Sequence, residues 1–162
     1  MTKSSQVKIR KANIGDVEAI YKTIFEAFEP YKKHFTRDAY EMTVISHTEI
    51  KKRILDDKRE ILVAICDNEI VGSVTIGIKD QSNIYIQSMA VRPKYQGKGI
   101  GLRILEEIDK IAQKKKCKKI LLECFYPLKK AILLYEKCGF ERTKKIRDYY
   151  GIRIFEMLKE VK

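Results

Sequence analysis

Hydrophobic and polar positions along this chain follow two different periods, and stretches of the two kinds alternate. Short runs rich in β-branched and aromatic residues predict strands over residues 7–11, 61–66, 70–78, 84–91, 119–125, 141–147 and 152–158. Apolar residues three and four positions apart predict helices over residues 17–28, from about residue 41 to Leu55, over 101–112 and over 131–138. This alternation indicates an α/β protein. We expect a single domain, residues 1–162, because a chain of 162 residues is enough for one sizeable core.

The most informative stretch, residues 91–101, joins a predicted strand to a predicted helix and reads VRPKYQGKGIG. Its three glycines, at positions 97, 99 and 101, let the backbone turn without Cβ clashes and leave its N–H groups open. Together with the positive end of the following helix dipole, those donors form an anion cradle suited to a pyrophosphate. The G-x-G-x-x-G dinucleotide pattern fails because Leu102 takes its last position, and Gly97-Lys98-Gly99 does not supply a P-loop.

A second motif lies in the last predicted helix. Ala131, Leu134, Tyr135 and Cys138 form an apolar face at helical spacing, and Gly139 ends the helix. Taken alone, a tyrosine on such a stripe is better explained by core packing than by function.

The two motifs together resemble the GNAT N-acetyltransferase superfamily. Gln96, Gly99 and Gly101 match its Q/R-x-x-G-x-G/A acetyl-coenzyme A loop, and residues 89–93 resemble its pantetheine-binding strand. Residues 131–140 look like its A-x-x-x-Y-x-x-x-G-F segment. The order of predicted elements extends the resemblance over essentially the whole chain. It implies a GNAT-like α/β fold with a central, mixed but mostly antiparallel sheet of about seven strands flanked by four helices.

The resemblance implies acetyl-coenzyme A as co-substrate and assigns roles to individual residues. Tyr135 would be the general acid that protonates the departing sulfur. The backbone at Met89 and Val91 would hold the cofactor arm and polarise the thioester carbonyl. The family often has Asn three residues before the alanine, whereas this chain has Leu128, so the pantetheine contact expected there is in question. The complete predicted cofactor site is Met89, Ala90, Val91, Gln96, Gly97, Lys98, Gly99, Ile100, Gly101 and Leu102.

The general base and the acceptor site are less clearly marked. Relatives often place a glutamate on or before the signature strand, where this chain has none, so Glu123 on the adjacent strand is the candidate base. A salt-bridged surface carboxylate explains Glu123 equally well. The predicted acceptor site consists of Glu29, Tyr31, Tyr149 and Tyr150. The paired tyrosines resemble a feature of protein N-terminal acetyltransferases, and a packing pair in a hairpin is the alternative.

Composition narrows the remaining choices. The formal net charge of +12 invites a nucleic-acid partner, but the densest basic run, residues 114–119, sits at a predicted helix end and has no aromatic interleaving. We therefore expect no nucleic-acid partner. No apolar run reaches the length of a membrane span, and the N-terminus lacks a signal-peptide core, so we expect no membrane partner and a cytoplasmic protein. The four cysteines show no zinc-ligand spacing, so no metal is expected.

The sequence therefore predicts an N-acetyltransferase that moves an acetyl group directly from acetyl-coenzyme A to a primary amine in a ternary complex. The acceptor is a small-molecule amine or a protein amino group, the latter including protein N-termini. The alternative of a different class is a coenzyme A-binding module or regulator with little catalytic activity. An exposed edge of the C-terminal sheet could permit a homodimer.

Overall fold

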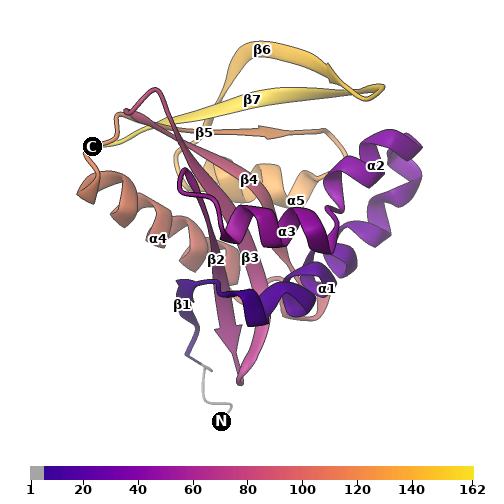
Figure 1. Ribbon diagram of the computed structural model, residues 1–162. Coiled ribbons are helices and arrows are strands. Elements are labelled where there is room, and N and C mark those ends of the chain that lie inside the picture. Colours follow the sequence, from indigo (N-terminus) through magenta and orange to yellow (C-terminus); the bar gives the residue numbers. More distant parts are fainter. Residues whose placement is uncertain (1–5) are drawn as a thin grey trace.

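The computed structural model describes residues 6–162 and is built around one seven-stranded sheet in the order β1-β2-β3-β4-β5-β7-β6 (Figure 1). Neighbouring strands are antiparallel except β4 and β5, which run parallel. The mixed, mostly antiparallel sheet predicted from the sequence is therefore confirmed. The strands are β1 (Lys8–Lys11), β2 (Arg59–Cys66), β3 (Glu69–Lys79), β4 (Asn83–Val91), β5 (Lys119–Cys124), β6 (Glu141–Tyr149) and β7 (Ile152–Glu160).

The four predicted helical stretches are present, with one difference. The second stretch is divided into two short helices, because Ser46 interrupts it and its side chain accepts a hydrogen bond from the backbone N–H of Glu49, as an N-cap residue does. No helix among residues 6–162 is long and apolar enough to cross a membrane. The helices are α1 (Val17–Phe28), α2 (Arg37–Thr43), α3 (His47–Ile54), α4 (Ile100–Lys114) and α5 (Lys129–Lys137).

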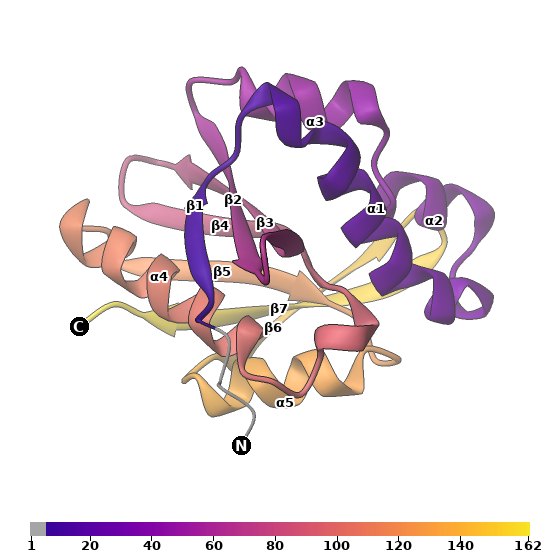
Figure 2. The ribbon, with the colours of Figure 1, turned by 90° about the horizontal axis from the view of Figure 1, so that it is seen from below.

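The helices cover the two faces of the sheet unequally. In Figure 2, α1 and α3 lie on one side of the sheet and α4 and α5 on the other. Ile20, Ile24 and Ile50 anchor the core on the α1–α3 side. The larger core, on the other side, is built around Ile104 and Ile108 of α4. Burial of these apolar faces fixes the positions of the helices that border the candidate site.

The parallel pair β4 and β5 separates after a short contact. Only residues 83–85 of β4 pair with residues 119–121 of β5. Beyond that point β5 continues to pair with β7, and β4 continues to pair with β3. The sheet therefore opens between two strands that each keep a partner on their other side.

Candidate active site

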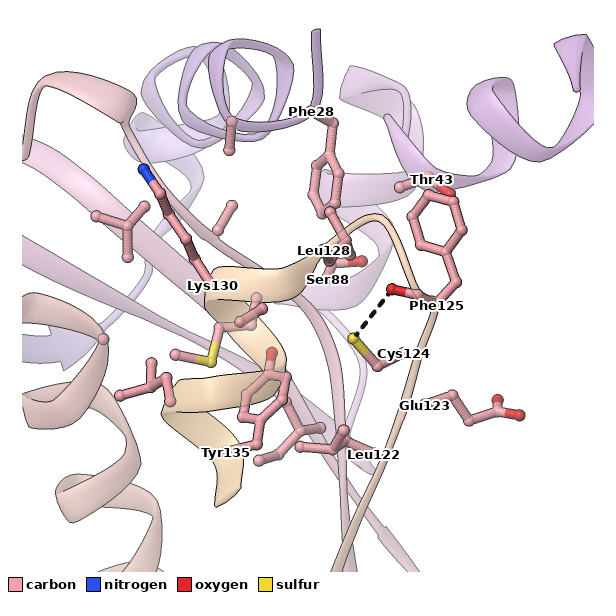
Figure 3. Close-up of a pocket in the computed structure, with 18 of the residues that line it drawn as sticks. Phe28, Thr43, Ser88, Leu122, Glu123, Cys124, Phe125, Leu128, Lys130 and Tyr135 are labelled. Atoms are coloured by element: carbon pink, nitrogen blue, oxygen red, sulfur yellow. Dashed lines mark hydrogen bonds between the residues drawn. The ribbon is translucent and has the colours of Figure 1, made fainter. Parts of the chain in front are cut away.

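The opening between β4 and β5 leads into a cavity of about 700 Å³. One end of this cavity is bordered by the start of α4 and by α5, and the other end by residues of α2, α3, β6 and β7. Most of the lining is apolar or aromatic, and Phe28, Phe125 and Leu128 face the opening (Figure 3). A cavity of this size with a few polar groups is typical of a small-molecule or cofactor site.

A β-bulge at Ser88 lies where β4 borders the opening. It reverses the order in which successive side chains of β4 point to one face of the sheet or the other. Ser88 has a left-handed backbone (φ 50°), and the β3–β4 register shifts there. Before the bulge, Ile84 and Ile86 point into the α4–α5 core, whereas after it Ala90 belongs to the core on the opposite face. A single extra residue in one strand has this effect.

The bulge decides which backbone groups face the opening. The N–H of Arg92 donates to Val71 O on β3 (2.8 Å), so strand alternation directs the N–H and C=O groups of Val91 and Met89 to the side of β5. The carbonyl of Val91 accepts a hydrogen bond from Gln96 Nε2 (2.9 Å). The N–H groups of Met89 and Val91 thus lie where the sequence predicts the cofactor arm.

The glycine loop that follows β4 forms the expected start of α4. Gly97 and Gly99 have positive φ angles of 77° and 82°, and a Cβ at either would meet no atom within 4 Å. The first helical hydrogen bond runs from Arg103 N to Gly99 O (3.0 Å), which leaves the N–H groups of residues 100–102 without helical partners. These groups and the helix dipole are the features from which the sequence predicts an anion cradle, and the binding of an anion there stays a prediction.

Gly101 and Lys98 differ from what we expected. A Cβ on Gly101 would lie 2.7 Å from Leu134 Cδ2, so this glycine is needed for the close packing of α4 on α5. Lys98 does not line the cavity, and its Nζ lies 5.4 Å from the ring centroid of Tyr95. The remaining predicted cofactor residues, Met89, Ala90, Val91, Gln96, Gly97, Gly99, Ile100 and Leu102, all line the cavity, as does Gly101.

Tyr135 lies on α5 with its hydroxyl directed into the pocket (Figure 3). The residue is buried, and its ring packs edge-on against the ring of Phe140, with the two ring centroids 5.9 Å apart. The helix ends in a Schellman motif, in which the N–H of Phe140 donates to Tyr135 O (3.0 Å) beside the left-handed Gly139. Burial, and secondarily the neighbouring Cys124, raise the pKa of the Tyr135 phenol. The hydroxyl therefore keeps its proton at neutral pH.

Two further residues complete this wall of the pocket. Cys124 donates a long hydrogen bond to the carbonyl of Phe125 (3.8 Å), and burial raises the pKa of its thiol to about 11. Leu128, which replaces the family's Asn, precedes α5 without a side-chain cap and packs against both cores.

Glu123 lines the cavity as an ion-paired carboxylate. Arg147 donates from Nε to Glu123 Oε2 (2.5 Å) and from Nη2 to Oε1 (2.7 Å). The hydrogen bond to Glu123 is also the largest cause of the raised pKa of Arg147. Glu123 is the one carboxylate that borders this pocket among residues 6–162, and its side chain points away from Tyr135 (Figure 3). The salt bridge that the sequence left open is present, and the role of Glu123 as base stays a prediction.

The structure brings only half of the predicted acceptor residues to the cavity. Tyr31 and Tyr149 line it, whereas Glu29 and Tyr150 do not. The rings of Tyr149 and Tyr150 pack edge to face, with their centroids 4.9 Å apart. The carbonyl of Tyr150 accepts a hydrogen bond from Thr36 Oγ1. The pair therefore packs as hairpin neighbours, and one member faces the pocket.

Arg53 is the residue that the sequence analysis missed. It is a buried arginine on α3 that borders the cavity, and Nε donates to Glu49 (3.1 Å). Its Nη1 donates to Thr75 Oγ1 and to Ser88 Oγ, both at 3.0 Å. In the sequence it is one of three consecutive basic residues near a helix end, a pattern typical of a solvated face. Among residues 6–162, no cluster of three or more His, Cys, Asp or Glu could hold a metal ion.

Comparison with known proteins identifies the family. The profile of the family described as "Acetyltransferase (GNAT) family" matches residues 17–140. The chain therefore belongs to the GNAT acetyltransferases, and the resemblance read from the sequence is confirmed.

Two relatives match most of the chain at similar identity. Glucosamine 6-phosphate N-acetyltransferase 1 of Dictyostelium discoideum is 29% identical over 144 residues, covering 84% of this chain and 85% of that protein. Spermine/spermidine N(1)-acetyltransferase of Bacillus subtilis is 28% identical over 130 residues, covering 72% of this chain and 84% of that protein. The two names give chemically different acceptors, an amino-sugar phosphate and a polyamine.

Two solved structures share the fold. The paia N-acetyltransferase from Thermoplasma acidophilum, in complex with coenzyme A, superposes with a TM-score of 0.84 at 21% identity, covering 96% of this chain and 99% of that chain. A GNAT family acetyltransferase from Elizabethkingia anophelis with acetyl-CoA bound gives a TM-score of 0.67 at 21% identity, covering 95% of this chain and 97% of that chain. The GNAT fold predicted from the sequence is therefore confirmed.

Proposed function

We propose that this protein transfers the acetyl group of acetyl-coenzyme A to a primary amine, with both substrates bound at the opening between β4 and β5. The observation that carries the proposal is the position of Tyr135. Its protonated hydroxyl points into a cavity that is also lined by the N-terminal residues of α4, where backbone N–H groups lack helical partners. The family membership supports the same reaction class.

The cofactor fits the end of the cavity at α4. The pyrophosphate accepts hydrogen bonds from the N–H groups of residues 100–102, and the positive end of the α4 dipole favours its charge. The pantetheine arm runs along β4, where the N–H groups of Met89 and Val91 face the opening. The net charge of +12 also attracts a polyanionic cofactor over a distance.

The reaction is a direct displacement on the thioester. The amine nitrogen attacks the carbonyl carbon, a C–N bond forms, and the C–S bond then breaks to release a thiolate. The N–H groups of β4 stabilise the developing oxyanion. Tyr135 gives its proton to the departing sulfur. Holding both reactants at the same opening supplies much of the rate increase.

The proton lost by the amine goes to Glu123, directly or through a water molecule. Glu123 is the pocket carboxylate among residues 6–162, and for this role the acceptor must loosen its ion pair with Arg147. We expect Glu123→Gln to lower kcat by at least about tenfold, as removal of a general base does. An unchanged kcat would mean that water or the substrate disposes of the proton.

The acceptor is the less defined substrate. Tyr31 and Tyr149 border the acceptor end, and an amine with an apolar or aromatic body suits the surrounding side chains. A small-molecule amine and a protein amino group, including a protein N-terminus, are both candidates.

Release of free thiol from acetyl-coenzyme A, measured with a panel of amines and peptides, tests the proposal. We expect acceptor-dependent release with at least one class: amino-sugar phosphates, polyamines, aromatic alkylamines or peptides. Tight cofactor binding without acceptor-dependent release across the panel would instead favour a coenzyme A-binding module. The ion pair that occupies Glu123 is the observation that favours this second candidate.

A further inference from the structure

We infer that Arg53 is a positioning residue that holds the β4 bulge in the conformation in which the N–H groups of Met89 and Val91 face the opening. The inference deepens the proposed function and rests on it, because those groups are the ones proposed to bind the thioester. Arg53 itself acts through Ser88.

The bulge is a strained element that needs support. Ser88 has φ 50°, in the left-handed region that is unfavourable for a residue with a Cβ. Such conformations persist when the surroundings over-determine them. The surroundings here include one guanidinium nitrogen, Arg53 Nη1, which donates to Ser88 Oγ and to Thr75 Oγ1 at 3.0 Å each.

One of these two contacts lies at the edge of the register shift, and the other lies on a residue within the bulge. Thr75 is on β3 and pairs with Gln87, the residue immediately before the bulge. On the other side of the shift, Ser73 pairs with Ala90. Arg53 therefore ties the bulged residue to the strand against which it bulges.

Without the bulge, odd-numbered residues along all of β4 would direct their backbone N–H groups to the same side as residues 85 and 87 do. Residues 89 and 91 would then direct their N–H groups toward β3, away from the cofactor. The contact between Arg53 and Ser88 thus controls the direction of the donors proposed to bind the thioester carbonyl and the cofactor arm.

Arg53 is well placed to hold this position because its own geometry is fixed. It is buried, and Nε donates to Glu49 one turn earlier on α3 (3.1 Å). Arg59 also donates to Glu49 (3.4 Å) and to Asp56 (2.8 Å). Replacing Arg53 with methionine keeps an apolar stem and leaves Glu49 with Arg59 as a partner. Arg59 is the matched control, since it shares Glu49 but makes no hydrogen bond to Ser88 or Thr75.

The test compares Arg53→Met, Arg53→Lys and Arg59→Met by thiol release and by calorimetry with acetyl-coenzyme A, after circular dichroism has shown that each is folded. For Arg53→Met we expect kcat to fall by at least about tenfold, because oxyanion donors are misdirected. Its acetyl-coenzyme A affinity should fall about threefold to tenfold, the worth of one or two hydrogen bonds. The kcat and the cofactor affinity of Arg59→Met should change little, and those of Arg53→Lys should lie between the values of the wild type and Arg53→Met.

A double variant separates positioning from general stability. Glycine adopts the left-handed conformation without strain, so Ser88→Gly combined with Arg53→Met should recover part of the kcat lost in Arg53→Met. Equal losses in Arg53→Met and Arg59→Met, or no recovery by Ser88→Gly, would overturn the inference. If none of the amines tested causes the wild type to release thiol, the proposed function fails. The affinities for acetyl-coenzyme A then still test the role of Arg53.

Discussion

Gly101 on α4 and Leu134 on α5 are packed so closely that a Cβ on the glycine would lie 2.7 Å from Leu134 Cδ2. Both residues line the wall of the cavity on the cofactor side. The last glycine of the loop thus serves the packing of two helices, whereas Gly97 and Gly99 serve the turn of the backbone. The three glycines of one motif have two separate physical functions.

The first prediction follows from this packing. Gly101→Ala should lower the free energy of unfolding by about 1 kcal/mol. This is at the low end of the usual cost of overpacking, because the end of the Leu134 side chain can move. Urea unfolding measures the change. In a Leu134→Ala background the same substitution should cost nothing, or gain stability, because alanine favours the helix. An equal loss in both backgrounds would contradict the contact as the cause.

Gly99 gives a prediction about cofactor affinity. Gly99→Asp should weaken acetyl-coenzyme A binding by at least about tenfold, which is about 1.4 kcal/mol. The carboxylate would stand beside the proposed pyrophosphate site, and repulsion adds to the strain at φ 82°. Gly99→Asn is the control, since asparagine is similar in size, uncharged and tolerant of the left-handed region. Calorimetry should find the asparagine variant tighter than the aspartate variant, and equal affinities would argue against an anion there.

The buried thiol of Cys124 predicts a loss of stability at alkaline pH. Its pKa is raised from 9.0 to about 11 in the folded protein, so above pH 9 the unfolded chain loses a proton that the folded chain keeps. The stabilising contribution is therefore complete below pH 9 and is lost as the pH rises toward 11.

Urea unfolding of the wild type and of Cys124→Ala at pH 8 and pH 10.5 measures this contribution. The wild type should lose about 2 kcal/mol more than the variant between the two pH values, as a pKa shift of this size requires. The packing cost of alanine is the same at both pH values and cancels in the comparison. Parallel losses in the two proteins would mean that the thiol is not responsible.

Much of the fold could be predicted from the sequence because its signals are local. Hydrophobic periodicity located the strands and most of the helices, and the glycine loop and the Gly139 stop marked the ends that border the pocket. The second helix was misjudged because the apolar pattern continues through Ser46, whose capping role depends on its own side chain.

The parts of the site that could not be predicted depend on contacts between distant residues. The reversal at Ser88 involves Arg53, which lies 35 residues earlier in the chain. The ion pair of Glu123 involves Arg147, which lies 24 residues later. A strand sequence carries no local mark of either contact. The same reason explains why Glu29 and Tyr150 were expected at a cavity that they do not line.

The kcat of Tyr135→Phe tests the central claim most directly. The substitution keeps the buried ring and removes one hydroxyl, which faces the pocket and holds its proton at neutral pH. With an accepted amine, measured by thiol release and by mass spectrometry of the acetylated product, kcat should fall by at least about tenfold, while the KM for acetyl-coenzyme A changes little. A kcat within about twofold of the wild type, with chemistry rate-limiting, would contradict the claim and make Tyr135 a packing residue.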